Sequence, residues 1–237
     1  MNPTIMRLTA RALLGRRRVL LLLPMPILLI GMTLIGVTSG ADDNEWGPPV
    51  LGNLGLSVIL PLTALIVASS VLGLEIDDGT ITHLLTKPLP RSEIVLSKLV
   101  VAWAVTAAAT AVPLALAALI AGSGSLAVGM VVGATFASLA YCALFLALSL
   151  LTKRPVAVGL VYIMLWENLL VSFVDGARVF SVRQHATAIA DGIGGNDLLS
   201  ATVSVPTALI VSAVFIVVGT VGATRRLSSF ALTGEAT

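Results

Sequence analysis

Long apolar runs separated by short polar connections dominate the chain. A helix needs about 20 apolar residues to cross the hydrocarbon core of a membrane, and six stretches are of about that length. These stretches are roughly 19–38, 51–74, 97–121, 126–151, 156–174 and 204–223. The strands of a membrane barrel would show about ten residues of alternating polarity, and no such alternation is seen. The pattern predicts an all-α integral membrane protein, a single transmembrane domain of six helices.

Composition supports the membrane as the solvent. Hydrophobic residues make up 57% of the chain and charged residues 11%, with a mean hydropathy of +1.03. Soluble domains carry roughly 25% charged residues, so the chain has too little charge to cover a surface that faces water. The first apolar run is longer than the 7–15 apolar residues typical of a signal peptide, and we therefore expect it to be a span.

The basic residues gather on one side of the predicted membrane. All but two of the 14 lie on that side: Arg7, Arg11, Arg16, Arg17, Arg18, Lys87, Arg91, Lys98, Lys153, Arg154, Arg225 and Arg226. Only Arg178 and Arg183 fall on the other side, where the first loop carries acidic residues instead. Cytoplasmic loops are enriched in Lys and Arg, so both termini are predicted to be cytoplasmic. Because the charges sit at the ends of apolar runs, a nucleic-acid partner is not expected. The richness in Arg, Ala, Val and Gly favours a bacterial plasma membrane.

Residues 4–18 have the pattern of an amphipathic helix that lies on the membrane surface. Ile5, Leu8 and Ala12 share one face, whereas Arg7 and Arg11 share another with Arg18. Such a helix binds anionic lipid headgroups through its charges and the acyl boundary through its apolar face. A simple topology anchor is the alternative.

The connection at residues 75–96 is the only sizeable cytoplasmic loop between spans, and it contains a short predicted helix. Asp77 and Asp78 can cap its start, and Pro88 ends it. Ile81, Leu84 and Leu85 then form an apolar face. The loop itself offers nothing that could bury this face. It therefore needs a partner surface, either the inner ends of the spans or another protein.

The order of residues in this loop resembles the ABC-2 type transporter permeases, the membrane subunits of bacterial ABC exporters. The matching positions are Glu75, Gly79, Thr80, Leu84, Leu85, Pro88, Arg91 and Lys98. The resemblance implies that residues around 78–87, with Asp78 and Ile81, form a coupling helix that docks on a cytoplasmic ATPase. It also implies that residues 4–18, with Arg7 and Arg11, form a connecting helix beside it.

The segment 175–203 is the longest on the predicted outer side. Ser181 can cap a helix in which Val182, Ala186 and Ile189 share a face, and Gly192, Gly194 and Gly195 then break that helix. The resemblance implies an outer gate that dips into the membrane. An ordered surface lid without a gating role is the alternative.

The chain has no G-x-x-x-x-G-K-[ST] phosphate loop, so ATP and Mg are expected on a separate ATPase subunit. With six spans per chain, we expect a second permease copy, as a homodimer, and two ATPase copies. The apolar spans suggest a hydrophobic or amphipathic cargo, such as a drug, a lipid or a peptide, moved outward by efflux of the multidrug-resistance kind.

Glu167 is the only acidic residue inside a span, and Asn168 follows it. Ionisable groups in a membrane usually face protein or water, so both are candidates for a substrate path or gate. Alternatively, Glu167 bonds a neighbouring helix or an outer arginine, with Trp166 as an interface anchor.

No catalytic or metal site is predicted. His83 and His185 lie on opposite sides of the membrane, and Asp77 and Asp78 have no further ligands at suitable spacing. An intramembrane enzyme acting on lipid or peptide is an alternative function, but the spans hold one carboxylate and no histidine. A complex that senses or resists an antimicrobial is a third possibility. Gly129 and Gly133 form a small-xxx-small pair that lets two helices approach closely.

Overall fold

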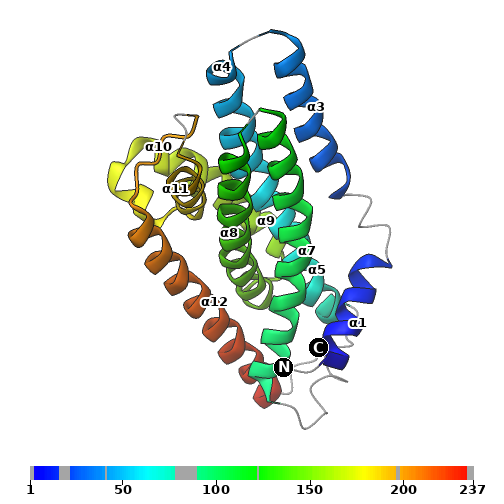
Figure 1. Ribbon diagram of the computed structural model, residues 1–237. Coiled ribbons are helices and arrows are strands. Elements are labelled where there is room, and N and C mark those ends of the chain that lie inside the picture. Colours follow the sequence, from blue (N-terminus) through cyan, green and yellow to red (C-terminus); the bar gives the residue numbers. More distant parts are fainter. Residues whose placement is uncertain are drawn as a thin grey trace.

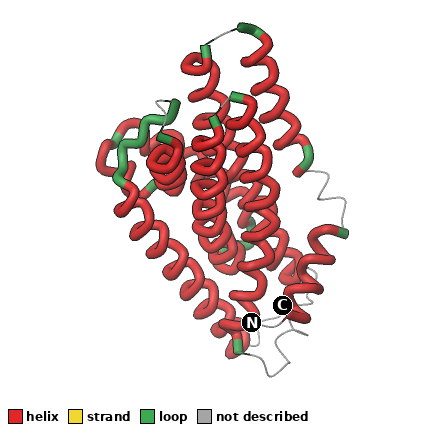
Figure 2. The backbone as a smooth tube through the Cα atoms, viewed as in Figure 1, coloured by secondary structure: helices red, strands yellow, loops and turns green. Residues whose placement is uncertain are grey.

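The computed structural model describes residues 3–15, 22–40, 42–77, 90–121, 123–195 and 198–233, and the regular structure within these ranges is helical (Figure 2). The elements are α1 (Pro3–Leu14), α3 (Pro24–Thr38), α4 (Asp43–Gly47), η1 (Pro48–Ile59), α5 (Leu60–Asp77), α7 (Arg91–Ile120), α8 (Gly124–Leu151), α9 (Pro155–Val161), η2 (Tyr162–Leu170), α10 (Val171–Phe173), η3 (Asp175–Phe180), α11 (Val182–Gly194) and α12 (Val205–Thr233). Figure 1 shows a bundle with α8 near its middle and with α1 and the last turns of α12 at the same end.

Five helices in the described ranges are long and apolar enough to cross a membrane: Asp43–Leu72, Arg91–Ile120, Gly124–Leu151, Pro155–Phe173 and Val205–Ser229. They correspond to the second through sixth predicted spans. The described part of the first predicted span is α3, which has 15 residues, fewer than the roughly 20 that a crossing needs. Residues 16–21 lie outside the described residues, so the sixth crossing stays a prediction.

The second span is one continuous helical run that begins at Asp43, eight residues before the predicted start. Pro48 and Pro49 are the first two residues of η1, where the run changes from α to π geometry, and proline has no backbone N–H to donate at this change. The run has π geometry through η1 and changes to α geometry at Leu60, directly before Pro61. Proline removes a backbone donor and crowds the preceding turn, so Pro61 falls where the helical geometry changes.

The central helix α8 packs against α5, α7, α11 and α12. Its Tyr141 and Phe145 rings stack with centroids 5.8 Å apart, and Phe145 meets Tyr162 of η2 edge-on at 6.2 Å. All three rings fill the interior between α8 and the fifth span. Offset and edge-to-face pairs of this kind add to the energy of simple burial.

Helix α11 lies directly on a glycine face of α8. A Cβ atom at Gly129 would be 2.3 Å from the Ala190 carbonyl oxygen, and one at Gly133 would be 2.6 Å from the Ala186 carbonyl oxygen. Both distances are shorter than any real contact, so only glycine allows this approach. The predicted close approach at the glycine pair is confirmed, and its partner is α11.

Gly133→Val is therefore expected to push α11 away from α8. Overpacking of a tight contact costs about 1–3 kcal/mol, which should lower the midpoint of thermal unfolding of the purified protein in detergent. Gly222→Val is the matched control, because nothing lies within 4 Å of a Cβ atom at Gly222. Equal changes in the two variants would show that α11 does not depend on the glycine face.

Candidate functional site

Helix α11 is the centre of the candidate site. It begins at the predicted Ser181 cap, but it continues through Gly192 and Gly194, where a break was predicted, and ends only at Gly195. The Ser181 hydroxyl caps it by accepting a hydrogen bond from the Gln184 amide at 3.2 Å. Val182, Ala186 and Ile189 are all buried. The helix ends at Gly195, whose φ of +60° lies in the left-handed region that glycine adopts without strain. Figure 1 shows α11 lodged between α8 and α12.

Glu167 is fully buried and bonded to the start of α11. Its Oε1 accepts hydrogen bonds from the Val182 amide at 3.0 Å and from the Tyr162 hydroxyl at 3.1 Å. Its Oε2 accepts a hydrogen bond from the Ser181 hydroxyl. Three donors thus converge on one carboxylate, which suits a group that only accepts hydrogen bonds when ionised.

The π geometry of η2 brings Tyr162 to Glu167. The two residues are five positions apart, and they share a face because a π-helix bonds each residue to the one five positions earlier. Asn168 uses the same spacing, since its Nδ2 donates to the Ile163 carbonyl at 2.9 Å. Asn168 is half-buried and its side chain folds back on its own helix.

Burying a carboxylate is costly unless its acceptor sites are satisfied. Here the hydrogen bonds compensate, and the first turn of α11 adds the positive end of a helix dipole. The hydrogen bonds that stabilise the buried Glu167 carboxylate therefore also fix the position of α11. The structure places Glu167 in contact with a neighbouring helix, and its part in a substrate path stays a prediction.

His185 joins α11 to the last span. Its Nε2 lies 2.7 Å from the Val179 carbonyl oxygen and its Nδ1 lies 3.0 Å from the Ser212 hydroxyl of α12. A carbonyl only accepts hydrogen bonds, so Nε2 carries the proton and Nδ1 accepts from Ser212. Burial lowers the pKa of His185, against the opposing effects of the Val179 hydrogen bond and the Glu167 charge. The imidazole is therefore neutral at neutral pH.

This serine–histidine pair was not anticipated from the sequence, which placed His185 in an outer loop. The two residues are 27 positions apart in the chain, and no local pattern links them. Both are almost completely buried, which leaves no room for a substrate beside the hydroxyl. The pair joins two helices and gives no support to an intramembrane enzyme. Within the described ranges, no cluster of three His, Cys, Asp or Glu residues could hold a metal ion.

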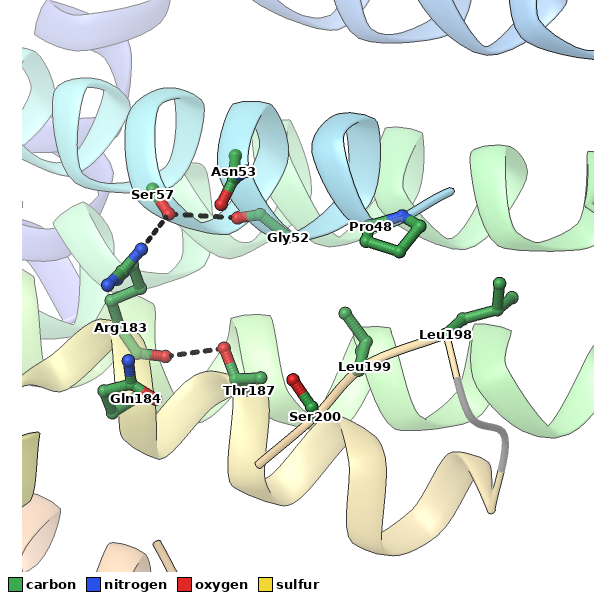
Figure 3. Close-up of a pocket in the computed structure, with 10 residues that line it drawn as sticks. All are labelled: Pro48, Gly52, Asn53, Ser57, Arg183, Gln184, Thr187, Leu198, Leu199 and Ser200. Carbon is green, nitrogen blue, oxygen red and sulfur yellow. Dashed lines mark hydrogen bonds between the residues drawn. The ribbon is translucent and has the colours of Figure 1, made fainter. Parts of the chain in front are cut away.

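A cavity of about 270 Å³ lies between α11 and η1, with residues 198–200 along its side (Figure 3). Arg183 of α11 reaches across it, and its Nη1 donates to the Ser57 hydroxyl oxygen at 3.0 Å. Ser57 in turn donates to the Gly52 carbonyl at 3.0 Å. We call this cavity the α11 pocket. No local sequence pattern indicates this pocket, because Arg183 and Ser57 are 126 positions apart.

Most of the predicted coupling residues lie outside the described residues: Asp78, Gly79, Thr80, Ile81, Leu84, Leu85 and Pro88. Glu75 falls in the last turn of α5, and Arg91 is the first residue of α7. Residues 91–96, assigned to the loop from the sequence, thus form the first turns of α7. Nearby, the buried Lys98 of α7 donates to the Val71 carbonyl of α5 at 3.0 Å.

Helix α1 packs against α5 and α7 at the end of the bundle where α12 also ends. Ile5 and Thr9 are buried there, whereas Arg7 and Arg11 are exposed. Leu8 is 60% exposed, so the predicted apolar face is divided. Ile5 packs against the bundle, whereas the described part of the chain leaves the Leu8 side chain largely uncovered.

The comparisons with known proteins agree with this architecture. A family model described as ABC-2 family transporter protein matches residues 16–184, which is more than half of the chain. The chain belongs to the ABC-2 transporter family. The match includes the loop at 75–96 and Glu167, and it ends inside α11. No curated protein matches the chain. An ABC-2 permease is a membrane transport subunit that associates with an ABC ATPase.

Glu167→Gln is expected to loosen α11 in this ABC-2 permease. The amide would turn an N–H₂ group towards donors, and each unsatisfied buried group costs about 1–3 kcal/mol. Such a loss corresponds to roughly a five-fold or larger rise in the open population. Limited digestion with trypsin should therefore cut after Arg183 faster than in the wild type.

Glu45→Gln is the control for this experiment, because Glu45 is exposed on α4 and the chemical change is identical. It should leave the digestion rate unchanged. If Glu167→Gln also digests at the wild-type rate, then Glu167 does not hold α11 in place.

Proposed function

We propose that the chain is the permease of an ATP-driven exporter that moves a hydrophobic or amphipathic molecule outward. The observation that carries the proposal is the family match across residues 75–96, the loop in which the sequence predicts a helix with an apolar face that needs a partner. The chain has no phosphate loop of its own. Residues around 78–87 would therefore dock on a separate ATPase that binds ATP and Mg.

The proposed orientation puts α1 and the end of α12 in the cytoplasm of a bacterial cell. It rests on the gathering of basic residues at that end, since cytoplasmic loops are enriched in Lys and Arg. The α11 pocket then lies towards the outside. This makes α11 the candidate for an outer gate, with Glu167 as the group that holds it closed.

The second and third spans provide a route for coupling. The proposed coupling helix joins α5 to α7, and the hydrogen bond from Lys98 to the Val71 carbonyl ties these two helices together. The α5 helix continues without a break into η1, which lines the α11 pocket. A displacement of the proposed coupling loop would be transmitted to the outer end of the bundle through this continuous helix. A closed two-fold pair of permeases would provide the cleft for the cargo.

The coupling proposal is tested by changing Leu84 and Leu85 to Asp together. Two charges on the apolar face should prevent docking, because burying an unpaired carboxylate is strongly unfavourable. We expect the co-expressed ABC ATPase from the neighbouring gene to be lost from the tagged permease during purification.

The control is Lys153→Asp, which places a negative charge at an exposed position in the other connection on the proposed cytoplasmic side. It should retain the ATPase. If the Leu84 and Leu85 variant also retains the ATPase and its ATP-driven transport, residues 78–87 are not the coupling helix.

A further inference from the structure

The α11 pocket is polar for a cavity within an apolar bundle. Arg183 is the only charged residue among the described residues that line it. The amides of Asn53 and Gln184 and the hydroxyls of Ser57, Thr187 and Ser200 complete its polar surface. Figure 3 shows Arg183, Gln184 and Thr187 on α11 facing Asn53 and Ser57 on η1. The Ser57 and Thr187 hydroxyls already donate to the Gly52 and Arg183 carbonyls, so the guanidinium and the two amides remain able to donate to an anion here.

Arg183 has donors to spare in this pocket. A guanidinium carries five N–H groups in a fixed fork, and Nη1 donates to Ser57. The Nε–H is buried and has no acceptor within the described part of the chain. Ser57 points its own hydrogen at the Gly52 carbonyl, which leaves its lone pairs for the arginine. The hydrogen bond to Ser57 holds the guanidinium at the cavity, and other N–H groups of the guanidinium can donate to a ligand.

The carboxylate at the start of α11, Glu167, already has its hydrogen-bond partners. Glu167 takes its three hydrogen bonds from Tyr162, Ser181 and Val182, so it is committed to the start of α11. Among the described residues that line the pocket, none carries a carboxylate. An arginine in such a setting pairs most strongly with a carboxylate or phosphate supplied from outside, because its fork matches their oxygens.

The position of Arg183 adds to its preference for an anion. It is the second residue of α11, where the positive end of the helix dipole lies. It is also one of only two basic residues on the side of the membrane that is depleted of them. Basic residues are scarce on the outer side of membrane proteins. A half-buried arginine there indicates that its charge binds a ligand and does not set the orientation of the chain in the membrane.

We propose that the α11 pocket binds the oxyanion, phosphate or carboxylate, of an amphipathic molecule. Arg183 supplies the charge and two of its N–H groups, and the Asn53 and Gln184 amides add neutral donors. A cavity of 270 Å³ is below the usual size of a site for a whole ligand, about 300–1,000 Å³. It therefore holds the head of the molecule, and the apolar part stays outside, towards the lipid. Placing the pocket on the outer side rests on the proposed function, whereas the binding chemistry does not.

Two sources carry this chemistry: an anionic membrane lipid and an amphipathic cargo. We suggest native mass spectrometry of the purified permease with phosphatidylglycerol, phosphatidylcholine and dodecyl phosphate as probes. Arg183→Ala should bind the anionic probes about ten-fold more weakly or worse, since hydrogen bonds to charged groups are among the strongest. Asn53→Leu keeps the charge but fills the pocket, and it should weaken the same probes by a smaller factor.

Arg154→Ala is the matched control, because it removes one positive charge from an exposed position outside the pocket. It should bind every probe as the wild type does. A loss confined to phosphatidylglycerol in Arg183→Ala identifies a lipid site, and a loss confined to dodecyl phosphate identifies a site for a cargo-like anion. Equal binding by Arg183→Ala and Arg154→Ala overturns the proposal. No ATP is used, so the result is independent of whether residues 78–87 couple to an ATPase.

Discussion

The buried carboxylate of Glu167 needs three hydrogen-bond donors, and only one of them comes from its own helix. The other two are the Ser181 hydroxyl and the Val182 amide at the start of α11, so α11 must begin at the depth of Glu167. From that fixed start the helix runs along the glycine face of α8, where only glycine permits contact between the backbones. His185 then ties the same helix to α12. The α11 pocket is the space between α11, held in this position, and η1.

Both sides of this arrangement depend on π-helical turns. In η2 the wide turn aligns Tyr162 with Glu167, and in η1 it aligns the Ser57 hydroxyl with the Gly52 carbonyl, again five residues apart. An α-helix would rotate each pair out of register. Short π segments are common at functional sites in proteins, and here one positions the group that holds α11 while the other forms the wall that faces Arg183. The η1 wall is continuous with α5, which leads to the proposed coupling loop.

The sequence predicted the parts that depend on local pattern. Span positions followed from apolar length, and α11 followed from the Ser181 cap and the spacing of Val182, Ala186 and Ile189. Glu167 was singled out because a lone carboxylate in a span needs partners. The pairs His185 with Ser212 and Arg183 with Ser57 were missed, since their members come from distant helices. The π turns were missed because apolar periodicity was judged against α geometry. The predicted start of the second span came too late in the chain, because a pair of prolines such as Pro48 and Pro49 is typical of a loop.

Helix α11 is an integral part of the bundle, held at one end by Glu167 and along its length by α8. Hydrogen–deuterium exchange of the wild-type protein in lipid nanodiscs tests this most directly, because amide protection reports local opening. The amides of residues 185–194 should be protected to nearly the same degree as those of α8. Exchange as fast as in the connection at residues 198–204 would contradict the account, since α11 would then lie on the bundle without being held by it.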